Sequence, residues 1–208
     1  MAIFNIYFSN CVLLLLTLSS RTSTGLPVRA LGSEKSKDCS LQFRALLLNV
    51  TQLLSNDVLC YGIPTDKMVV KSKSDTAMAC APNLAQKPGC MIQRNSTFSE
   101  SECMSNIMKD LAHYSAAIKS YLNSALRNKE EEEELLRPTL GMIQSLRKNC
   151  SLMPDEDEDP SEAEAAQLWR GTSFSNRKEM CKMMRGFYVR TITINRAMGY
   201  IASGDHKN

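Results

Sequence analysis

The sequence predicts an all-α fold, namely an up-up-down-down four-helix bundle with two long crossover loops. Two observations predict it. Four stretches repeat apolar residues at alternating spacings of three and four, which is typical of helices with one buried face. The connections between these stretches are long, short and long, in that order. We place the helices at about residues 39–59, 103–127, 135–149 and 176–203.

The first two helices each carry one apolar face that we expect to be buried against other helices. The first helix lies between Cys39 and Cys60, and the second begins at Cys103. In the first, the apolar face consists of Phe43, Leu46, Leu47, Val50, Leu53, Leu54 and Val58. In the second, it consists of Met104, Ile107, Met108, Leu111, Tyr114, Ile118, Leu122 and Ala125.

The third helix follows a short connection that holds five glutamates, residues 130–134. Negative charge suits the N-terminus of a helix, where the macrodipole favours it. Proline is tolerated only in the first helical turn, so Pro138 suggests that this helix begins near it. Its inward residues are Leu135, Leu136, Met142, Ile143 and Leu146.

The fourth helix, 176–203, is the longest, at about 42 Å for a rise of ~1.5 Å per residue. Asn176 and Glu179 form a predicted capping pair at its start. Its apolar face consists of Met180, Met184, Phe187, Thr191, Ile194, Met198 and Ile201, and its opposite face carries Arg185, Arg190, Asn195 and Arg196. We therefore expect a charged outer face along the whole bundle.

The lengths of the connections determine the predicted topology. Two consecutive helices lie parallel only if their link returns along a helix of ~30 Å, which takes at least about 9–10 extended residues. Residues 61–102 and 150–173 exceed that length, whereas 128–134 do not. The first and second helices are therefore parallel, as are the third and fourth. This is the topology of growth hormones and cytokines.

Residues 1–25 read as a signal peptide, and residues 26–208 as the four-helix domain. A short apolar run, Val12 to Leu18, precedes the small residues Ser23 and Gly25, although the usual leading positive charge is missing. That run is too short to cross a bilayer, and no later stretch is long and apolar enough. We therefore expect a secreted, extracellular protein without membrane insertion.

The small net charge of +3 conceals a segregation of charge. Residues 130–134 and 155–164 hold 12 of the 22 acidic residues, so the remaining surface is basic. Both runs are expected to be solvated. The basic remainder lacks the interleaved aromatic residues of a nucleic-acid site, so we expect no nucleic acid as a partner. An acidic protein partner fits better.

The cysteines predict a disulfide framework with one cysteine left over. Of eight, Cys11 belongs to the signal, which leaves seven in a secreted domain. The predicted topology brings together the ends of helices that carry Cys60 and Cys181, and likewise Cys39 and Cys150. Cys103 can pair with either Cys80 or Cys90, and we favour Cys80. Cys90, in a Pro-Gly-Cys turn, is then free for an intermolecular disulfide or remains a free thiol.

Three sequons predict N-glycosylation, at Asn49, Asn95 and Asn149. Asn95 lies on a predicted loop. Asn49 is at the edge of the buried face of the first helix, and Asn149 is next to a predicted disulfide cysteine.

Signatures of catalysis and of cofactor or metal binding are absent from the sequence. It contains no phosphate-binding loop, nucleophile elbow, zinc-protease motif or dinucleotide fingerprint. His113 and His206 are isolated, and no cysteine pair has zinc spacing. We therefore predict neither enzyme activity nor a cofactor.

The last helix carries a family resemblance. Thr193-Ile194-Asn195-Arg196, followed by Met198 and Tyr200, resembles the interleukin-12 alpha subunit family, in a form divergent enough to suggest a non-mammalian vertebrate. Supporting similarities are the run from Cys103 to Tyr114 and the spacing of Cys80 and Cys90.

The resemblance implies a cytokine subunit that is disulfide-linked to a receptor-like interleukin-12 beta subunit. The heterodimer would bridge two interleukin-12 receptor chains on T and natural killer cells and promote interferon-gamma production. Cys90 matches the family's interchain cysteine. Arg196 matches an arginine that enters an acidic pocket of the beta subunit, with Arg190, Asn195 and Tyr200 expected beside it. The crossover cysteine that pairs with the first helix in the family is missing here, and Cys150 is additional.

Two other function classes compete with this reading. A self-sufficient, single-chain interleukin-6-type cytokine would need no covalent partner, and the spare cysteine argues against it. A secreted helical enzyme lacks its catalytic residues here, and a lipid carrier lacks a cavity because large side chains fill the predicted core.

Overall fold

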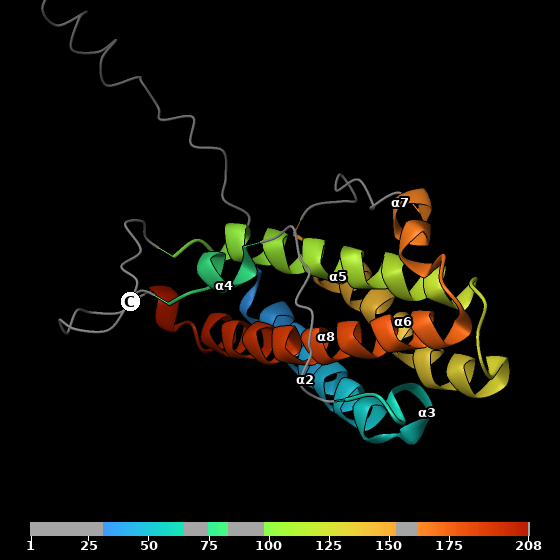
Figure 1. Cartoon of the computed structure of the whole chain (residues 1–208). Coiled ribbons are helices and arrows are strands. Elements are labelled where there is room, and N and C mark those ends of the chain that lie inside the picture. Colours follow the sequence, from blue (N-terminus) through green and yellow to red (C-terminus); the bar gives the residue numbers. More distant parts are fainter. Residues whose placement is uncertain (1–30, 65–74, 83–97, 153–161, 208) are drawn as a thin grey trace, which may run out of the picture.

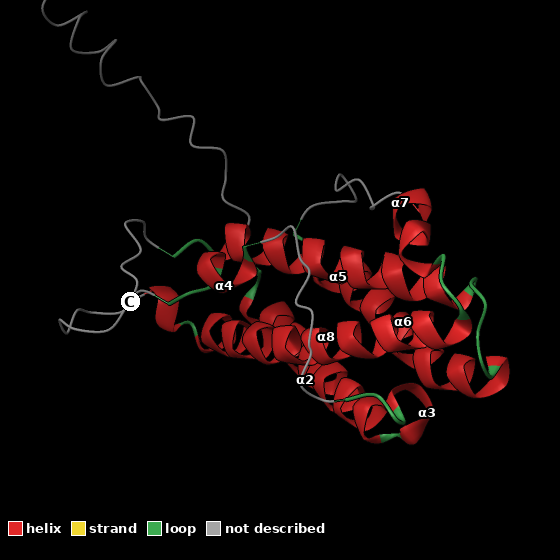
Figure 2. Ribbon diagram, viewed as in Figure 1, coloured by secondary structure: helices red, strands yellow, loops and turns green. Residues whose placement is uncertain are grey.

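The computed structural model describes residues 31–64, 75–82, 98–152 and 162–207. Within these ranges every regular element is a helix and none is a strand, which confirms the predicted fold class (Figure 2). No helix in the described part of the chain is both long and apolar enough to cross a bilayer. The predicted signal peptide, Cys90 and Asn95 lie outside the described residues.

Four long helices form the bundle, and short helices flank them (Figure 1). The long helices are α2 (Ser33–Ser55), α5 (Glu100–Leu122), α6 (Lys129–Cys150) and α8 (Ser173–Ser203). The short elements are α3 (Asp57–Cys60), α4 (Thr76–Ala79), α7 (Glu162–Ala166) and the 3₁₀ turns η1 (Gln167–Trp169) and η2 (Asp205–Lys207).

Contacts between the helix ends establish the up-up-down-down order. The start of α2 lies beside the start of α5, because the backbone N–H of Leu31 donates to the Glu100 carboxylate over 2.7 Å. The start of α2 also lies beside the end of α6, through the disulfide between Cys39 and Cys150. In α8 the amide of Asn195, near the C-terminal end, donates to the carbonyl of Phe43 in the first half of α2. Helices α2 and α5 are thus parallel to each other and antiparallel to α6 and α8.

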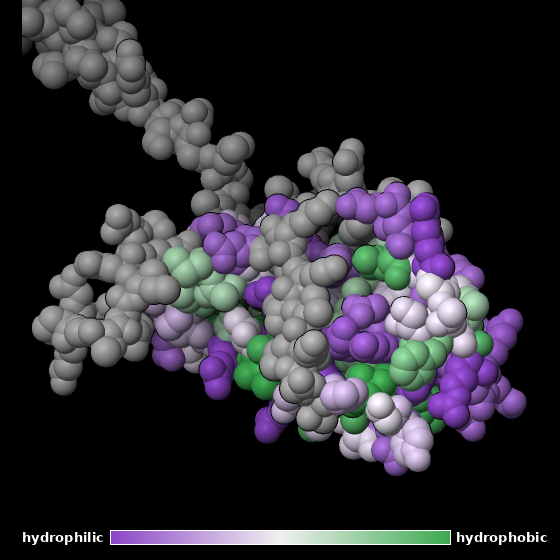
Figure 3. Space-filling model, viewed as in Figure 1, coloured by the Kyte–Doolittle hydropathy of each residue, from purple (hydrophilic) through white to green (hydrophobic). Residues whose placement is uncertain are grey.

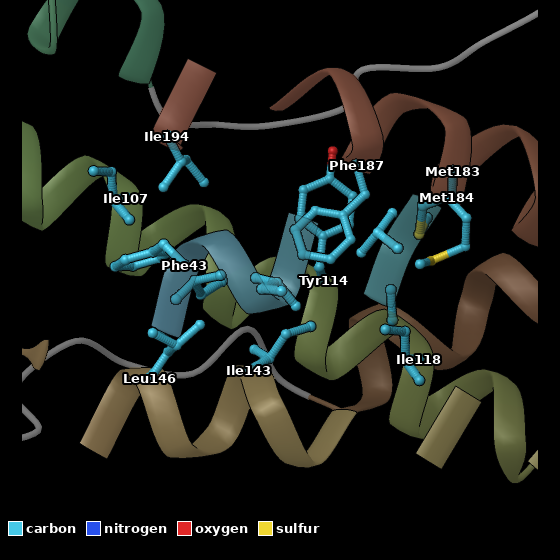
Figure 4. Packing of buried hydrophobic residues seen from close by; sticks show 14 of the residues in the cluster. Phe43, Ile107, Tyr114, Ile118, Ile143, Leu146, Met183, Met184, Phe187 and Ile194 are labelled. Carbon is cyan, nitrogen blue, oxygen red and sulfur yellow. The ribbon is translucent and has the colours of Figure 1, made fainter. Parts of the chain in front are cut away.

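The core lies where the apolar faces of the four long helices meet (Figure 4). Phe43 of α2, Tyr114 of α5, Ile143 of α6 and Phe187 of α8 all have 0% exposure. The Tyr114 and Phe187 rings are packed with their centroids 4.1 Å apart. Large interdigitating side chains therefore fill the centre of the bundle.

The start of α6 differs from the prediction. The helix begins at Lys129, so the glutamates are helical and Pro138 is its tenth residue. Asn128 caps the start by accepting the N–H of Glu131. Pro138 removes one hydrogen bond, to the carbonyl of Glu134. Both residues are exposed, so water can bind that carbonyl and the helix continues.

The start of α8 also differs, because Asn176 and Glu179 do not form its cap. Thr172 caps the helix, its hydroxyl accepting the N–H of Ser175 over 3.3 Å. Asn176 is buried, and its amide bonds backward to the N–H of Gly171 and the carbonyl of Trp169. The asparagine therefore fastens the turn that precedes the helix.

Candidate partner-binding site

Three of the four arginines of α8 bind groups of the chain itself. Arg177 is 3% exposed and donates to the carbonyls of Leu59 and Tyr61, each over 3.0 Å. Arg185 donates to the carbonyls of Pro64 (2.7 Å) and Ile63 (3.4 Å). Arg185, expected on the charged outer face of this helix, therefore binds the segment that follows α3.

Arg177 and Arg185 belong to one line of residues that holds the segment after α2. Cys181 lies midway between them, four residues from each, and residues at this spacing share one face of a helix. Its disulfide to Cys60 joins α8 to the end of α3. Two arginine contacts and one disulfide thus hold residues 59–64 against α8.

Arg190 is also turned inward. Its guanidinium Nε lies 3.2 Å from the Asp110 carboxylate, and the two side chains are 10% and 0% exposed. The hydroxyl of Thr76 donates to the same carboxylate, so one buried charge joins α4, α5 and α8. Burial raises the pKa of the nearby Tyr114, the charge of Asp110 raises it further, and Arg190 lowers it.

Asn195 and Tyr200 also contact other parts of the bundle. The Asn195 amide donates to the carbonyls of Phe43 (3.0 Å) and Thr191 (2.8 Å). The Tyr200 ring is half-buried and forms a T-shaped pair with the Phe98 ring, with the centroids 5.1 Å apart. The expected outer face is therefore narrower than the sequence suggested, because Arg190 and Asn195 bind their own chain. Their role in partner binding stays a prediction.

Arg196 differs from the other three arginines. It is exposed, and it makes no hydrogen bond or ion pair with any residue that the structure describes. Val189, seven residues earlier on the same line, is 38% exposed. Gly199, three residues after Arg196, is exposed and has no side chain that could cover the arginine. We call Val189, Arg196, Gly199 and Tyr200 the outer face of α8.

The outer face of α8, with a free arginine among small and apolar residues, has the composition of a protein-binding surface. Arginine is enriched among the residues that dominate binding energy, particularly where the partner removes it from water. On the face in view in Figure 3, apolar surface forms separate patches between hydrophilic residues. This mixture is typical of interfaces between proteins that are also stable apart.

Three disulfides connect the described cysteines: Cys39 with Cys150, Cys60 with Cys181, and Cys80 with Cys103. The first two are the pairs that the predicted topology selected, and the third is the one we favoured of the two alternatives for Cys103. Their Cα atoms are 5.8, 5.3 and 4.7 Å apart, within the normal range for disulfides. All six described cysteines are therefore used within the chain.

Two of the predicted glycosylation sites lie within the described residues. Asn149 is exposed near the end of α6. Asn49 is half-buried between α2 and α6, and its amide oxygen accepts the hydroxyl of Thr139 over 2.6 Å. Glycosylation of either asparagine stays a prediction, with Asn149 the more accessible of the two.

The sequence analysis missed a set of buried carboxylates. Glu100, Asp110 and Glu132 are 6%, 0% and 1% exposed. Glu132 accepts the hydroxyl of Tyr121 and the backbone N–H groups of residues 127 and 128, which fixes the link between α5 and α6. Among the described residues no group of three or more His, Cys, Asp or Glu side chains could hold a metal ion. These carboxylates therefore bind other parts of the bundle.

Comparison with known proteins gives one consistent family. The family model described as Interleukin-12 alpha subunit matches residues 10–204. A protein of Marmota monax, Interleukin-12 subunit alpha, is 25% identical over 195 residues, which cover 81% of this chain and 84% of that protein. The protein of the same name from Equus caballus is 27% identical over 153 residues, covering 64% of each chain.

Proposed function

Because the chain belongs to the interleukin-12 alpha subunit family, whose members are cytokine subunits and not enzymes, we propose that it is the alpha subunit of a secreted heterodimeric cytokine. Its partner is an interleukin-12 beta subunit. The heterodimer binds two receptor chains on T and natural killer cells and promotes interferon-gamma production. Residues 1–25 direct secretion, and residues 26–208 form the mature domain.

The observation that supports pairing most directly is the free state of Arg196. The other arginines of α8 bind carbonyls or a carboxylate of the chain itself, so substituting them disturbs the fold. Arg196 has no such role in the described structure, and its guanidinium is available to an acidic pocket. An arginine that loses water on binding and gains a carboxylate partner contributes strongly to affinity.

The test reverses the charge of this residue. Arg196→Glu is expected to raise the Kd for the beta subunit by about 30-fold or more, as for a hot-spot residue. Arg44→Glu is the matched control, because Arg44 is also exposed but lies on α2. Circular dichroism should show equal helix content in both variants. Full pairing by Arg196→Glu would refute the role.

Cys90 is proposed to form the covalent link to the beta subunit. Non-reducing electrophoresis of medium from cells that make both subunits should show a band at the summed mass, and Cys90→Ser should abolish it. Efficient secretion of the wild-type chain alone, as an active monomer, would instead support a single-chain interleukin-6-type cytokine.

A further inference from the structure

The C-terminal tail folds back onto the start of α5. Gly204 ends α8 with φ of +78°, a left-handed conformation that glycine adopts readily and that reverses the chain. The reversal brings His206 beside Glu100, with His206 Nε2 3.3 Å from the carboxylate. Both side chains are almost fully buried, at 7% and 5% exposure.

Glu100 lies in the first turn of α5, and a positive charge beside it stabilises its buried carboxylate further. Its carboxylate is removed from water and accepts the N–H of Leu31, a neutral donor. A buried carboxylate is costly unless an opposite charge compensates it. Neither ring nitrogen of His206 makes a hydrogen bond within the described part of the chain, so the interaction of this ring with Glu100 is ionic and depends on its protonation.

The same histidine contacts the outer face of α8 through two aromatic rings. Its ring lies 5.9 Å from that of Tyr200 and 5.5 Å from that of Phe98, measured between centroids. Tyr200 follows Arg196 by four residues, so both lie on one side of the helix. On its own element, η2, His206 is flanked by Asp205, which is exposed, and by Lys207. The titratable groups that face it from the other helices are Glu100 of α5 and Tyr200 of α8. The pair with Glu100 therefore holds the end of the outer face.

We propose that His206 is a positioning residue of the outer face: its protonated ring pairs with Glu100 and holds Tyr200 in place for the partner protein. This inference rests on the proposed function. The ring carries a positive charge only when it is protonated, and protonation is favoured as the pH falls. Pairing is therefore tighter in mild acid than in mild base.

The experiment compares binding to immobilised beta subunit at two pH values, with Cys90→Ser chains so that only non-covalent binding is measured. For the otherwise wild-type chain, the Kd at about pH 8 should exceed that at about pH 6 by on the order of fivefold, a typical coupling between two sites. In His206→Gln the ratio of the two Kd values should fall to the part that comes from titratable groups of the beta subunit. His113→Gln, which changes the only other histidine, should keep the wild-type ratio.

An unchanged pH ratio in His206→Gln overturns the inference while the proposed function stands. If the wild-type chain fails to bind at both pH values, the proposed function fails instead. Thermal unfolding of the chain alone then tests the pair between His206 and Glu100. The melting temperature of the wild type should fall more between pH 6 and pH 8 than that of His206→Gln, and equal falls overturn the pair as well.

Discussion

The carboxylate of Asp110 lies 3.2 Å from the guanidinium of Arg190 and also accepts the hydroxyl of Thr76, so one buried charge joins α4, α5 and α8. The two residues are 80 positions apart in the sequence. The spacing of Arg190 suggests that it faces solvent, but its ion pair with Asp110 makes it a structural residue of the bundle.

Removal of Asp110 should destabilise the protein strongly. Asp110→Ala leaves the guanidinium of Arg190 buried without a partner, which typically costs about 3–5 kcal/mol. Denaturant unfolding measures the change. Glu133→Ala is the control, because Glu133 pairs with Arg137 on the surface of α6, where such a pair contributes about 0.3–0.5 kcal/mol. Equal losses in the two variants would contradict the structural role of Asp110.

Two buried tyrosines should make the fold sensitive to alkali. Burial is the main cause that raises the pKa of Tyr114 and Tyr121, and the charge of Asp110 and the hydrogen bond to Glu132, respectively, raise it further. A raised pKa in the folded state stabilises the fold below the unfolded value of about 10, and this contribution is lost as the pH rises above it, by up to ~1.4 kcal/mol per pH unit for each tyrosine.

Denaturant unfolding between about pH 9 and 11.5, with free thiols blocked, tests this dependence around the ordinary tyrosine pKa. Tyr121→Phe should roughly halve the decline in stability, since one of two buried phenols is removed. Tyr61→Phe, at a position that is 64% exposed, should leave the decline unchanged. A decline that is identical in all three proteins would exclude the buried tyrosines as its cause.

The two described sequons should respond differently to substitution. In unglycosylated protein, Asn49→Gln should cost about 1–3 kcal/mol, because it disrupts the acceptor of the fully buried Thr139 hydroxyl. Asn149→Gln, on the surface, should change the free energy of unfolding by less than about 0.5 kcal/mol. Chemical denaturation measures both. A loss at Asn149 as large as that at Asn49 would argue against the Thr139 hydrogen bond.

Two glycines should give opposite results when they are changed to alanine. Gly141 lies inside α6, and apart from its own helical turn nothing lies within 4 Å of the position of an added Cβ, so Gly141→Ala should stabilise the protein by up to ~1 kcal/mol. Gly204 has a positive φ, so Gly204→Ala should destabilise it by about 1–2 kcal/mol. Thermal melts compare the two directly, and a shift of the same sign in both would refute the argument.

The sequence predicted the helices well because their signal is local. Spacings of three and four identify the apolar face of each helix, and link lengths then restrict the topology. Local rules also caused the errors at the helix starts. Pro138 suggested a boundary by a general preference, but its lost hydrogen bond faces water. Asn176 fits a capping pattern, but Thr172 is placed to do the same task one turn earlier.

The candidate site was harder to predict because exposure depends on partners far away in the sequence. Arg190 and Arg196 are both charged residues outside the apolar spacing of α8, and the position of Asp110 on another helix makes only Arg190 a buried residue. His206 looked isolated for the same reason, since Glu100 is more than one hundred residues away. The four-residue spacing of Arg177, Cys181 and Arg185 is a local signal. It places the three residues on one line of the helix, and this line faces one segment, residues 59–64.

The disulfide between Cys60 and Cys181 also shortens the covalent path that carries the force when the two ends of the chain are pulled apart. From Cys39 to Cys181 the shortest covalent route runs through 21 residues and that disulfide, rather than through 142 residues. A fully stretched chain would extend about 70 Å along that route instead of ~480 Å. The disulfide between Cys39 and Cys150 adds a second route of 31 residues to Cys181, which is longer and becomes taut later when the ends are pulled. The oxidised, unfolded chain is consequently compact, and its unfolding should show a smaller denaturant m-value than that of the reduced chain.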